Sequence, residues 1–324
     1  MTPSRAAVNG RMWADAVQGG VRVVFCGTGW LPVVDAIRER LAGLGLADAR
    51  VEAADRSRPL APQLAECEVV LPSNAPFQRE LILGMPRLRL IQQPAVGHEG
   101  IDLAAARERG VPVCNAPGGS HDAVAQAALL LMLALARRLR GAQRGFAAAR
   151  IGVPLGVELG GRTLGLIGRG NTGSRLARLA DALGMRVLSV GASSSRRELE
   201  ALLAAADFVS IHCPLSERTR GLLGAAELAL MRRGAFLINC ARGAIVDRAA
   251  LEAALASGQL GGAGLDVYWD EPWDPAEPLF QRDDVIALPH VAGSTEEAFG
   301  RIAAIVAGNI RRLVDGHALE HRIA

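Results

Sequence analysis

Three glycines at fixed spacing give the first indication of chemistry in this sequence. Gly168, Gly170 and Gly173 form a G-x-G-x-x-G loop, which follows the apolar run TLGLI and precedes a helical pattern. In such a strand–loop–helix unit the glycines permit a tight turn, close approach of a pyrophosphate and packing of helix on strand, and the helix N-terminus offers N–H groups to the phosphates. The loop therefore predicts a dinucleotide site, and a tight turn without a ligand is the alternative. The predicted contacts here are Gly168, Arg169, Gly170, Asn171, Thr172 and Gly173.

The segment after the next strand indicates which dinucleotide is preferred. An NAD site usually carries Asp or Glu ~20 residues beyond the glycine loop, where it binds the ribose hydroxyls and repels a 2′-phosphate. Here MRVLSV is followed by Gly191 and then ASSSRR, without a carboxylate. We therefore expect NADP to be favoured, with NAD as the other option; alternatively, Ser195 and Glu198 only cap a helix and the arginines are solvated. The residues predicted to bind the phosphate are Ser193, Ser194 and Arg196 or Arg197.

The composition excludes several other kinds of chemistry. The sequence has no lysine, so all 36 basic residues are arginine, which rules out Schiff-base lysines and a P-loop. A net charge of +3 and few aromatic residues argue against nucleic-acid binding. Five cysteines without a C-x-x-C pair argue against disulfides and structural zinc, and the histidine spacing suggests no metal site.

The hydropathy pattern predicts no membrane segment. The longest apolar run, residues 127–136, is shorter than the ~20 residues that a helical span needs. The residues before about Gly20 lack the apolar centre of a signal peptide and are expected to form a loose arm. With its cysteines reduced, the protein is expected to be cytoplasmic.

Short apolar strands alternate with helical patterns, which predicts a two-domain α/β architecture. Residues 21–116 contain five strand patterns and should form a smaller, flavodoxin-like domain, completed by a C-terminal helix in residues 295–324. Residues 117–294 contain six strand patterns and predict a Rossmann domain with a doubly wound parallel sheet that binds NAD(P). Ser294 and Glu297 predict a capping box at the start of the last helix.

Four separate stretches occur in an order typical of one enzyme family. They are LRLIQQPAVGHEGIDLAAARERGVPVCNAP, HCPLSERTRGL, LINCARGAIVDRAALEAALASGQLGGAGLDVYWDEP and IALPHVAGSTEEA. Across residues 87–298 the sequence resembles the D-isomer-specific 2-hydroxyacid dehydrogenase family, and earlier residues match only as a βαβ pattern. The resemblance implies an oxidoreductase acting on CH–OH groups, which transfers a hydride between NAD(P)H and a small 2-oxo or D-2-hydroxy acid, as glyoxylate/hydroxypyruvate reductases do.

The resemblance also implies three catalytic residues. Arg242 would bind the substrate carboxylate and carbonyl, His290 would be the general acid/base, and Glu271 would pair with His290. These types suit the reaction, because reduction of a carbonyl needs a proton donor near neutral pH and a planar cation for the carboxylate. Taken singly, each has a structural alternative: an ion-pair partner, a solvated acid or a satisfied polar residue.

Further residues follow from the resemblance with weaker support. Asp266 can equally brace a loop, and Ser73 and Asn74 can equally form a simple turn. Cys213 and Cys240 are expected as small wall residues rather than nucleophiles, since no basic partner is suggested. The expected adenosine and nicotinamide contacts are Cys213, Pro214, Thr219, Cys240, Ala241, Asp266 and Gly293. The expected substrate contacts, besides Arg242, are Ser73, Asn74, Val96, Gly97 and His98.

The family members usually dimerise, and one helix here suits a homodimer. This helix follows Asp122, its expected N-cap, and is apolar on more than one side, as in a helix buried between domains or subunits. A cofactor-dependent, corepressor-like binding protein without turnover is the alternative function, although the retained Arg242, Glu271 and His290 favour catalysis. A hydrolase of the adenosylhomocysteinase type is disfavoured by the lack of lysine.

Overall fold

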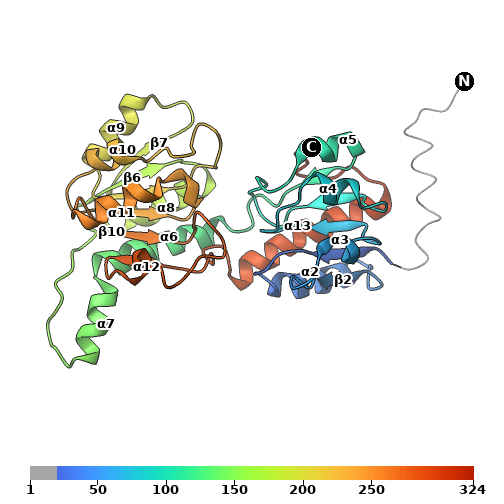
Figure 1. Ribbon diagram of the computed structural model, residues 1–324, viewed down its shortest axis with the longest axis horizontal. Coiled ribbons are helices and arrows are strands. Elements are labelled where there is room, and N and C mark those ends of the chain that lie inside the picture. Colours follow the sequence, from blue (N-terminus) through green and yellow to red (C-terminus); the bar gives the residue numbers. More distant parts are fainter. Residues whose placement is uncertain (1–19) are drawn as a thin grey trace, which may run out of the picture. The chain divides into compact units, whose positions relative to one another are not determined.

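The chain forms two compact units in a computed structural model that describes residues 20–324 (Figure 1). Of the described residues, the first unit contains 20–120 and the segment Ser294–Ala324, and the second is His121–Gly293. The loose arm predicted for the residues before Gly20 lies outside the described range. Among residues 20–324, no helix is both long and apolar enough to cross a bilayer.

The first unit is built on a parallel sheet of five strands in the order β2-β1-β3-β4-β5, the flavodoxin-like order. Along β1 and the residue after it, side chains point alternately to the two faces of the sheet. Val23 and Phe25 pack on the face covered by α2 and α13, and Val24 and Cys26 pack in the core on the other face. The strands are β1 (Arg22–Phe25), β2 (Arg50–Ala53), β3 (Val69–Leu71), β4 (Leu90–Gln92) and β5 (Val113–Cys114). The helices are α2 (Pro32–Gly43), α3 (Leu60–Gln63), α4 (Arg79–Leu83), α5 (Leu103–Arg109) and α13 (Glu296–Asp315).

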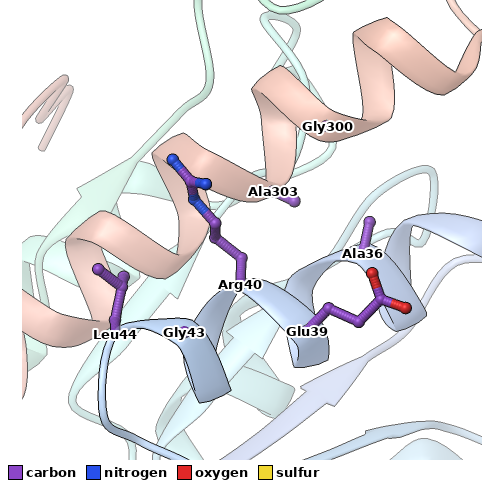
Figure 2. Close-up of a pocket in the computed structure, with 7 residues that line it drawn as sticks. All are labelled: Ala36, Glu39, Arg40, Gly43, Leu44, Gly300 and Ala303. Carbon is purple, nitrogen blue, oxygen red and sulfur yellow. The ribbon is translucent and has the colours of Figure 1, made fainter.

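Helices α2 and α13 pack against each other. Where their facing residues are small, a groove of about 350 Å³ lies between the two helices (Figure 2). Glu39 and Arg40 contribute its polar edge. None of the predicted cofactor or substrate residues lines it, so it is not the candidate site. Its lining is Ala36, Glu39, Arg40, Gly43, Leu44, Gly300 and Ala303.

The second unit is built on a parallel sheet of six strands in the order β11-β10-β9-β8-β6-β7, which confirms the doubly wound α/β prediction. The strand order reverses between β6 and β8, because β7 lies on one side of β6 and β8 lies on the other. The strands are β6 (Thr163–Ile167), β7 (Arg186–Val190), β8 (Phe208–Ile211), β9 (Ala235–Asn239), β10 (Leu260–Leu265) and β11 (Val285–Ala287). The helices are α6 (His121–Ala136), α7 (Leu139–Ala147), α8 (Asn171–Ala182), α9 (Arg196–Ala205), α10 (Ala225–Leu230), α11 (Arg248–Ala256) and α12 (Pro278–Gln281), with a 3₁₀ turn, η2 (Gly243–Ile245).

Two predicted helix starts are wrong by about one residue. The hydroxyl of Thr295, not Ser294, accepts the N–H of Ala298 and caps α13, because Thr295 is the last residue with extended backbone. Helix α6 begins at His121, so Asp122 lies inside the first turn and forms an ion pair with Arg175 of α8. Both predictions placed the cap from spacing alone, which does not locate the last extended residue.

Candidate active site

The glycine loop connects β6 to α8. At both of its ends the glycine backbone lies very close to other backbone atoms. Gly168 has a φ of +98°, and a Cβ there would lie 2.7 Å from the backbone nitrogen of Cys213. A Cβ on Gly173 would lie 2.2 Å from the carbonyl oxygen of Gly168. A Cβ on Gly170 would meet no described atom within 4 Å. The loop is thus tight where it touches protein and open where a phosphate would approach.

The first turn of α8 provides the other half of an anion site. In the part of the chain that the structure describes, no side chain caps this helix, and its first turn has no acidic residue. Its N–H groups and the positive end of its dipole are therefore available to a pyrophosphate. Together with the space at Gly170, this arrangement fits NAD(P) at the point where the strand order reverses.

The segment between β7 and α9 is compact and partly self-bonded. The predicted capping box is confirmed: Ser195 N–H donates to Glu198 Oε2 at 2.7 Å, and Glu198 N–H donates to Ser195 Oγ at 3.3 Å. The hydroxyl of Ser194 accepts the N–H of Gly191 at 3.1 Å, whereas Ser193 is exposed. The loop thus keeps its serines at the end of β7, where a ribose would lie.

Arg196 is oriented toward acids rather than toward this loop. Its Nε donates to Glu200 Oε1 at 2.9 Å, and its Nη2 forms an ion pair with Glu227 of α10. The hydrogen bond and charge of Glu227, with those of Glu200, raise the pKa of Arg196. The prediction that Arg196 binds a phosphate therefore meets two acidic partners that the sequence pattern did not reveal.

Arg242, Glu271 and His290 come together at the carboxyl edge of the second sheet. They follow β9, β10 and β11 respectively, and parallel neighbouring strands end at the same edge. His290 Nδ1 and Glu271 Oε2 lie 2.7 Å apart, and both side chains are partly exposed. The charge of Arg242 acts on the Glu271 carboxylate, so the three groups share one electrostatic environment.

Burial and polar contacts act in opposite directions on the carboxyl of Glu271. Burial raises its pKa, but the hydrogen bond and charge of His290, the N–H of Tyr268 at 3.1 Å and the charge of Arg242 outweigh burial and lower it. Glu271 is therefore ionised at neutral pH. Because its pKa in the folded state is lowered, these contacts stabilise the fold above the ordinary value of 4.5, and that contribution is lost as pH falls through the lowered value.

Asp266 holds the backbone that follows His290. Its carboxylate is almost fully buried and accepts the N–H groups of Val291 at 2.8 Å and Ala292 at 3.0 Å. Burial raises its pKa to about 6, although both hydrogen bonds favour the ionised form. His290 itself has a φ of +53°, a conformation that surrounding contacts must maintain. Asp266 thus braces this loop, one of the two roles expected for it.

Two buried polar residues near this edge were missed from the sequence. Asn239, the last residue of β9, donates from Nδ2 to the carbonyl of Arg242 at 2.8 Å and accepts the N–H of Ala241 at 3.0 Å. The hydroxyl of Tyr268 donates to the carbonyl of Leu288 at 2.5 Å. The Asn239 bonds fix the turn that carries Arg242, and the Tyr268 bond joins the segment of Glu271 to that of His290. The sequence signal that could have identified Asn239 is its place as a polar residue at the end of an apolar strand.

The remaining cofactor-side residues lie on loops that follow β8, β9 and β11. Thr219 Oγ1 donates to the carbonyl of Pro214 at 2.7 Å, which closes the loop after β8. Burial raises the pKa of Cys213 to about 11 and that of Cys240 well above its ordinary value. Both thiols therefore stay protonated near neutral pH, in agreement with a wall role. Ala241 directly precedes Arg242, and Gly293 is the last residue of the unit.

The first substrate loop of the first unit follows β3. Ser73 has a φ of +56° and a half-buried side chain, and Asn74 is exposed. Asn74 Oδ1 accepts the N–H of Thr28 at 3.0 Å, and its Nδ2 donates to Thr28 Oγ1 at 2.8 Å. Asn74 therefore ties this loop to the turn after β1.

The second substrate loop follows β4 and contains Val96, Gly97 and His98. Asn115 Nδ2 donates to the carbonyl of Val96 at 2.9 Å. Gln93, which the sequence analysis did not select, donates from Nε2 to the carbonyl of Gly97 at 2.6 Å and to that of Ser73 at 3.0 Å. One buried amide thus joins both substrate loops. Its Oε1 has no hydrogen-bond partner among the described residues.

Comparison with known proteins identifies the family. Residues 129–292 match the family model described as the NAD binding domain of D-isomer specific 2-hydroxyacid dehydrogenases. A glyoxylate reductase of Korarchaeum cryptofilum is 37% identical over 278 residues, which cover 80% of this chain and 83% of the relative. The chain belongs to the D-isomer specific 2-hydroxyacid dehydrogenase family. It is accordingly an NAD(P)-linked oxidoreductase of 2-hydroxy acids, and its second unit carries the dinucleotide-binding fold.

Two further similarities extend over most of this dehydrogenase. A glyoxylate reductase of Aeropyrum pernix is 40% identical over 256 residues, which cover 73% of this chain and 76% of the relative. The crystal structure of a glyoxylate reductase from Paecilomyes thermophila superposes with a TM-score of 0.80 at 28% identity, covering 94% of this chain and 98% of that chain.

Among the described residues, no group of three or more His, Cys, Asp or Glu can hold a metal ion.

Proposed function

We propose that this dehydrogenase reduces a small 2-oxo acid to the D-2-hydroxy acid, with Arg242, Glu271 and His290 as its catalytic residues. The supporting observation is the 2.7 Å contact between His290 Nδ1 and Glu271 Oε2, with the charge of Arg242 acting on the same carboxylate. Glyoxylate is the first substrate to test, because two of the relatives that cover most of this chain are glyoxylate reductases.

His290 is the proton donor in this proposal. Its Nδ1 is bound to Glu271, which leaves Nε2 to give its proton to the carbonyl oxygen of the substrate. The ionised Glu271 orients the ring and stabilises the protonated imidazole before transfer. NAD(P)H, when bound, supplies the hydride for the carbonyl carbon. After transfer, the hydroxyl carries the former Nε2 proton and the imidazole is neutral.

Arg242 binds the carboxylate of the substrate in this proposal. Its guanidinium is a planar, permanently charged donor that can engage the carboxylate and the carbonyl oxygen. Asn239 fixes the backbone on which Arg242 stands. The proposed substrate contacts from the first unit are Ser73, Asn74, Val96, Gly97 and His98. The N–H groups of residues 96–98 would bind the carboxylate.

NADP is proposed as the preferred cofactor. The end of β7 has Gly191 in place of a carboxylate, with Ser193 and Ser194 beside it, so nothing at that position repels a 2′-phosphate. The pyrophosphate would bind at the glycine loop of residues 168–173. The loops that carry Cys213, Pro214, Thr219, Cys240, Ala241, Asp266 and Gly293 would surround the adenosine and nicotinamide.

A homodimer is proposed from the apolar surface of α6, α7 and the segment after it. Helix α7 projects from its unit, and Arg140 anchors it by donating to the carbonyls of Phe280 and Val285 (Figure 1). Phe146 is 89% exposed and Ile151 is 99% exposed. A second copy of this chain would cover these side chains. A cytoplasmic location stays a prediction from the sequence.

The test is a rate panel of glyoxylate, hydroxypyruvate, pyruvate and a larger 2-oxo acid, each with NADPH and with NADH. We expect turnover of at least one small acid and a higher kcat/KM with NADPH, and a D-configured product from any acid whose product is chiral, which excludes glycolate. The His290→Asn variant is the matched control for chemistry. Cofactor binding without turnover of any acid would contradict the proposal and favour a corepressor-like role.

A further inference from the structure

We propose that Arg218 and Arg169, rather than Arg196, recognise the 2′-phosphate of NADPH in this dehydrogenase. This inference rests on the proposed NADP preference and names the side chains responsible for it. It follows from three features of the second unit: the acidic partners of Arg196, the reach of Arg218 to the segment after β7, and the reach of Arg169 to β7 itself.

Arg196 is an unfavourable phosphate ligand in this fold. It contacts Glu200 on its own helix and Glu227 on α10, and the Glu227 side chain is only 10% exposed. A phosphate bound to Arg196 would have to compete with both carboxylates and would be repelled by them. Glu227 also accepts the N–H of Gly224 at 3.0 Å, which holds it beside Arg196.

Arg218 reaches the end of β7 from another loop. It lies after β8, in the stretch PLSERTRGL, and its Nη2 donates to the carbonyl of Ala192 at 3.4 Å. Ala192 lies between Gly191 and Ser193, where the ribose of a bound dinucleotide is expected. A guanidinium has five N–H donors, so one bond to Ala192 leaves others for a phosphate that also contacts the hydroxyl of Ser193.

Arg169 approaches the same segment from the glycine loop. Its Nη1 donates to Ser189 Oγ at 3.5 Å, and Ser189 is the second-last residue of β7. Both arginines are exposed and lie on loops that follow β6 and β8, the strands on either side of the point where the order reverses. Two guanidinium groups from different loops thus reach a segment whose residues 191–195 include no acid.

The experiment is isothermal titration calorimetry of the full chain with NADPH and with NADH. Arg218→Ala should raise the Kd for NADPH about tenfold, the size expected for one charge-assisted hydrogen bond to a phosphate. Its Kd for NADH should change less than twofold. Arg169→Ala should act in the same direction. Arg196→Ala is the matched control, which removes an identical charge and should leave the NADPH-to-NADH ratio unchanged.

Each outcome separates this inference from the proposed cofactor preference. A wild-type protein that binds NADH more tightly would contradict the preference, and the inference with it. A wild-type preference for NADPH that survives Arg218→Ala and Arg169→Ala, or that Arg196→Ala alone abolishes, would overturn only the assignment of Arg218 and Arg169. Thermal unfolding of each variant checks folding, and an equal loss of both cofactors would also overturn the assignment.

Discussion

At the scale of single residues, a carboxylate kept ionised beside an imidazole is the central feature of this site. Burial alone would favour the neutral form of Glu271, but contacts with His290, Tyr268 and Arg242 keep it charged. A fixed negative charge at Nδ1 favours a proton on that nitrogen and holds the orientation of the ring. In the proposed mechanism, proton transfer by His290 therefore depends on the charge of Glu271 and on the position of the ring.

Removing the imidazole should abolish reduction without affecting cofactor binding. Because His290 has a φ of +53°, asparagine is a better replacement than alanine, since it tolerates the left-handed region. We expect His290→Asn to lower kcat by about 10²–10⁴-fold. NADPH affinity, measured by calorimetry, should stay within twofold of wild type. A variant that keeps more than a tenth of the activity would remove His290 from the mechanism.

Neutralising Glu271 should shift the pH dependence of the reaction. Glu271→Gln keeps an oxygen for the N–H of Tyr268 but loses the charge that favours protonated His290. Reduction requires the protonated ring, so the pH above which kcat/KM falls should move to lower pH by about one unit, with roughly tenfold lower kcat. The measurement is the pH profile of 2-oxo acid reduction. An unmoved profile would show that Glu271 does not act on His290.

At the scale of elements, one buried side chain joins two loops of the first unit. The loops after β3 and β4 are irregular, and their carbonyls at Ser73 and Gly97 are both bonded by the buried amide of Gln93. Buried backbone carbonyls need such donors, since leaving one unsatisfied costs about 1–3 kcal/mol. The position of the predicted carboxylate-binding N–H groups therefore depends on Gln93.

Replacing Gln93 with methionine should weaken substrate binding specifically. Methionine has a similar length but no N–H donor, so the carbonyls of Ser73 and Gly97 lose the amide that joins them, and the melting temperature should also fall. We expect KM for the 2-oxo acid to rise about tenfold, while kcat at saturation and the NADPH Kd change less than threefold. Steady-state kinetics and a thermal melt test this. A fall in kcat without a change in KM would contradict a positioning role.

At the scale of the whole molecule, an apolar surface lies on α6, α7 and the segment that follows. Besides Phe146 and Ile151, Leu130 and Leu155 are exposed, at 53% and 82%. Monomeric proteins rarely expose contiguous apolar patches of more than a few hundred Å². In the sequence, apolar residues on more than one side of α6 also indicated that this helix is buried against another surface.

Charged substitutions on this surface should separate the proposed homodimer. Light scattering after size exclusion should give twice the 34.0 kDa chain mass for the wild type. The double variant Phe146→Asp and Ile151→Asp should give the single-chain mass, because two desolvated carboxylates would be unpaired in the interface. Glu39→Gln, on the exposed side of α2 in the first unit, is the control. A wild-type protein of single-chain mass would refute the homodimer.

The sequence by itself determined the two parallel sheets, the glycine loop and the membership of one enzyme family. These features depend on local patterns: apolar strands of regular spacing, glycines where a Cβ cannot fit, and short motifs in order. The tertiary structure decided several contacts between elements that the sequence patterns did not predict. It placed Arg196 against Glu227, brought Arg218 to Ala192, and revealed Gln93 and Tyr268 as links between segments. Such contacts join different elements of the fold, whereas local patterns specify only short-range partners such as Ser195 and Glu198 of the capping box.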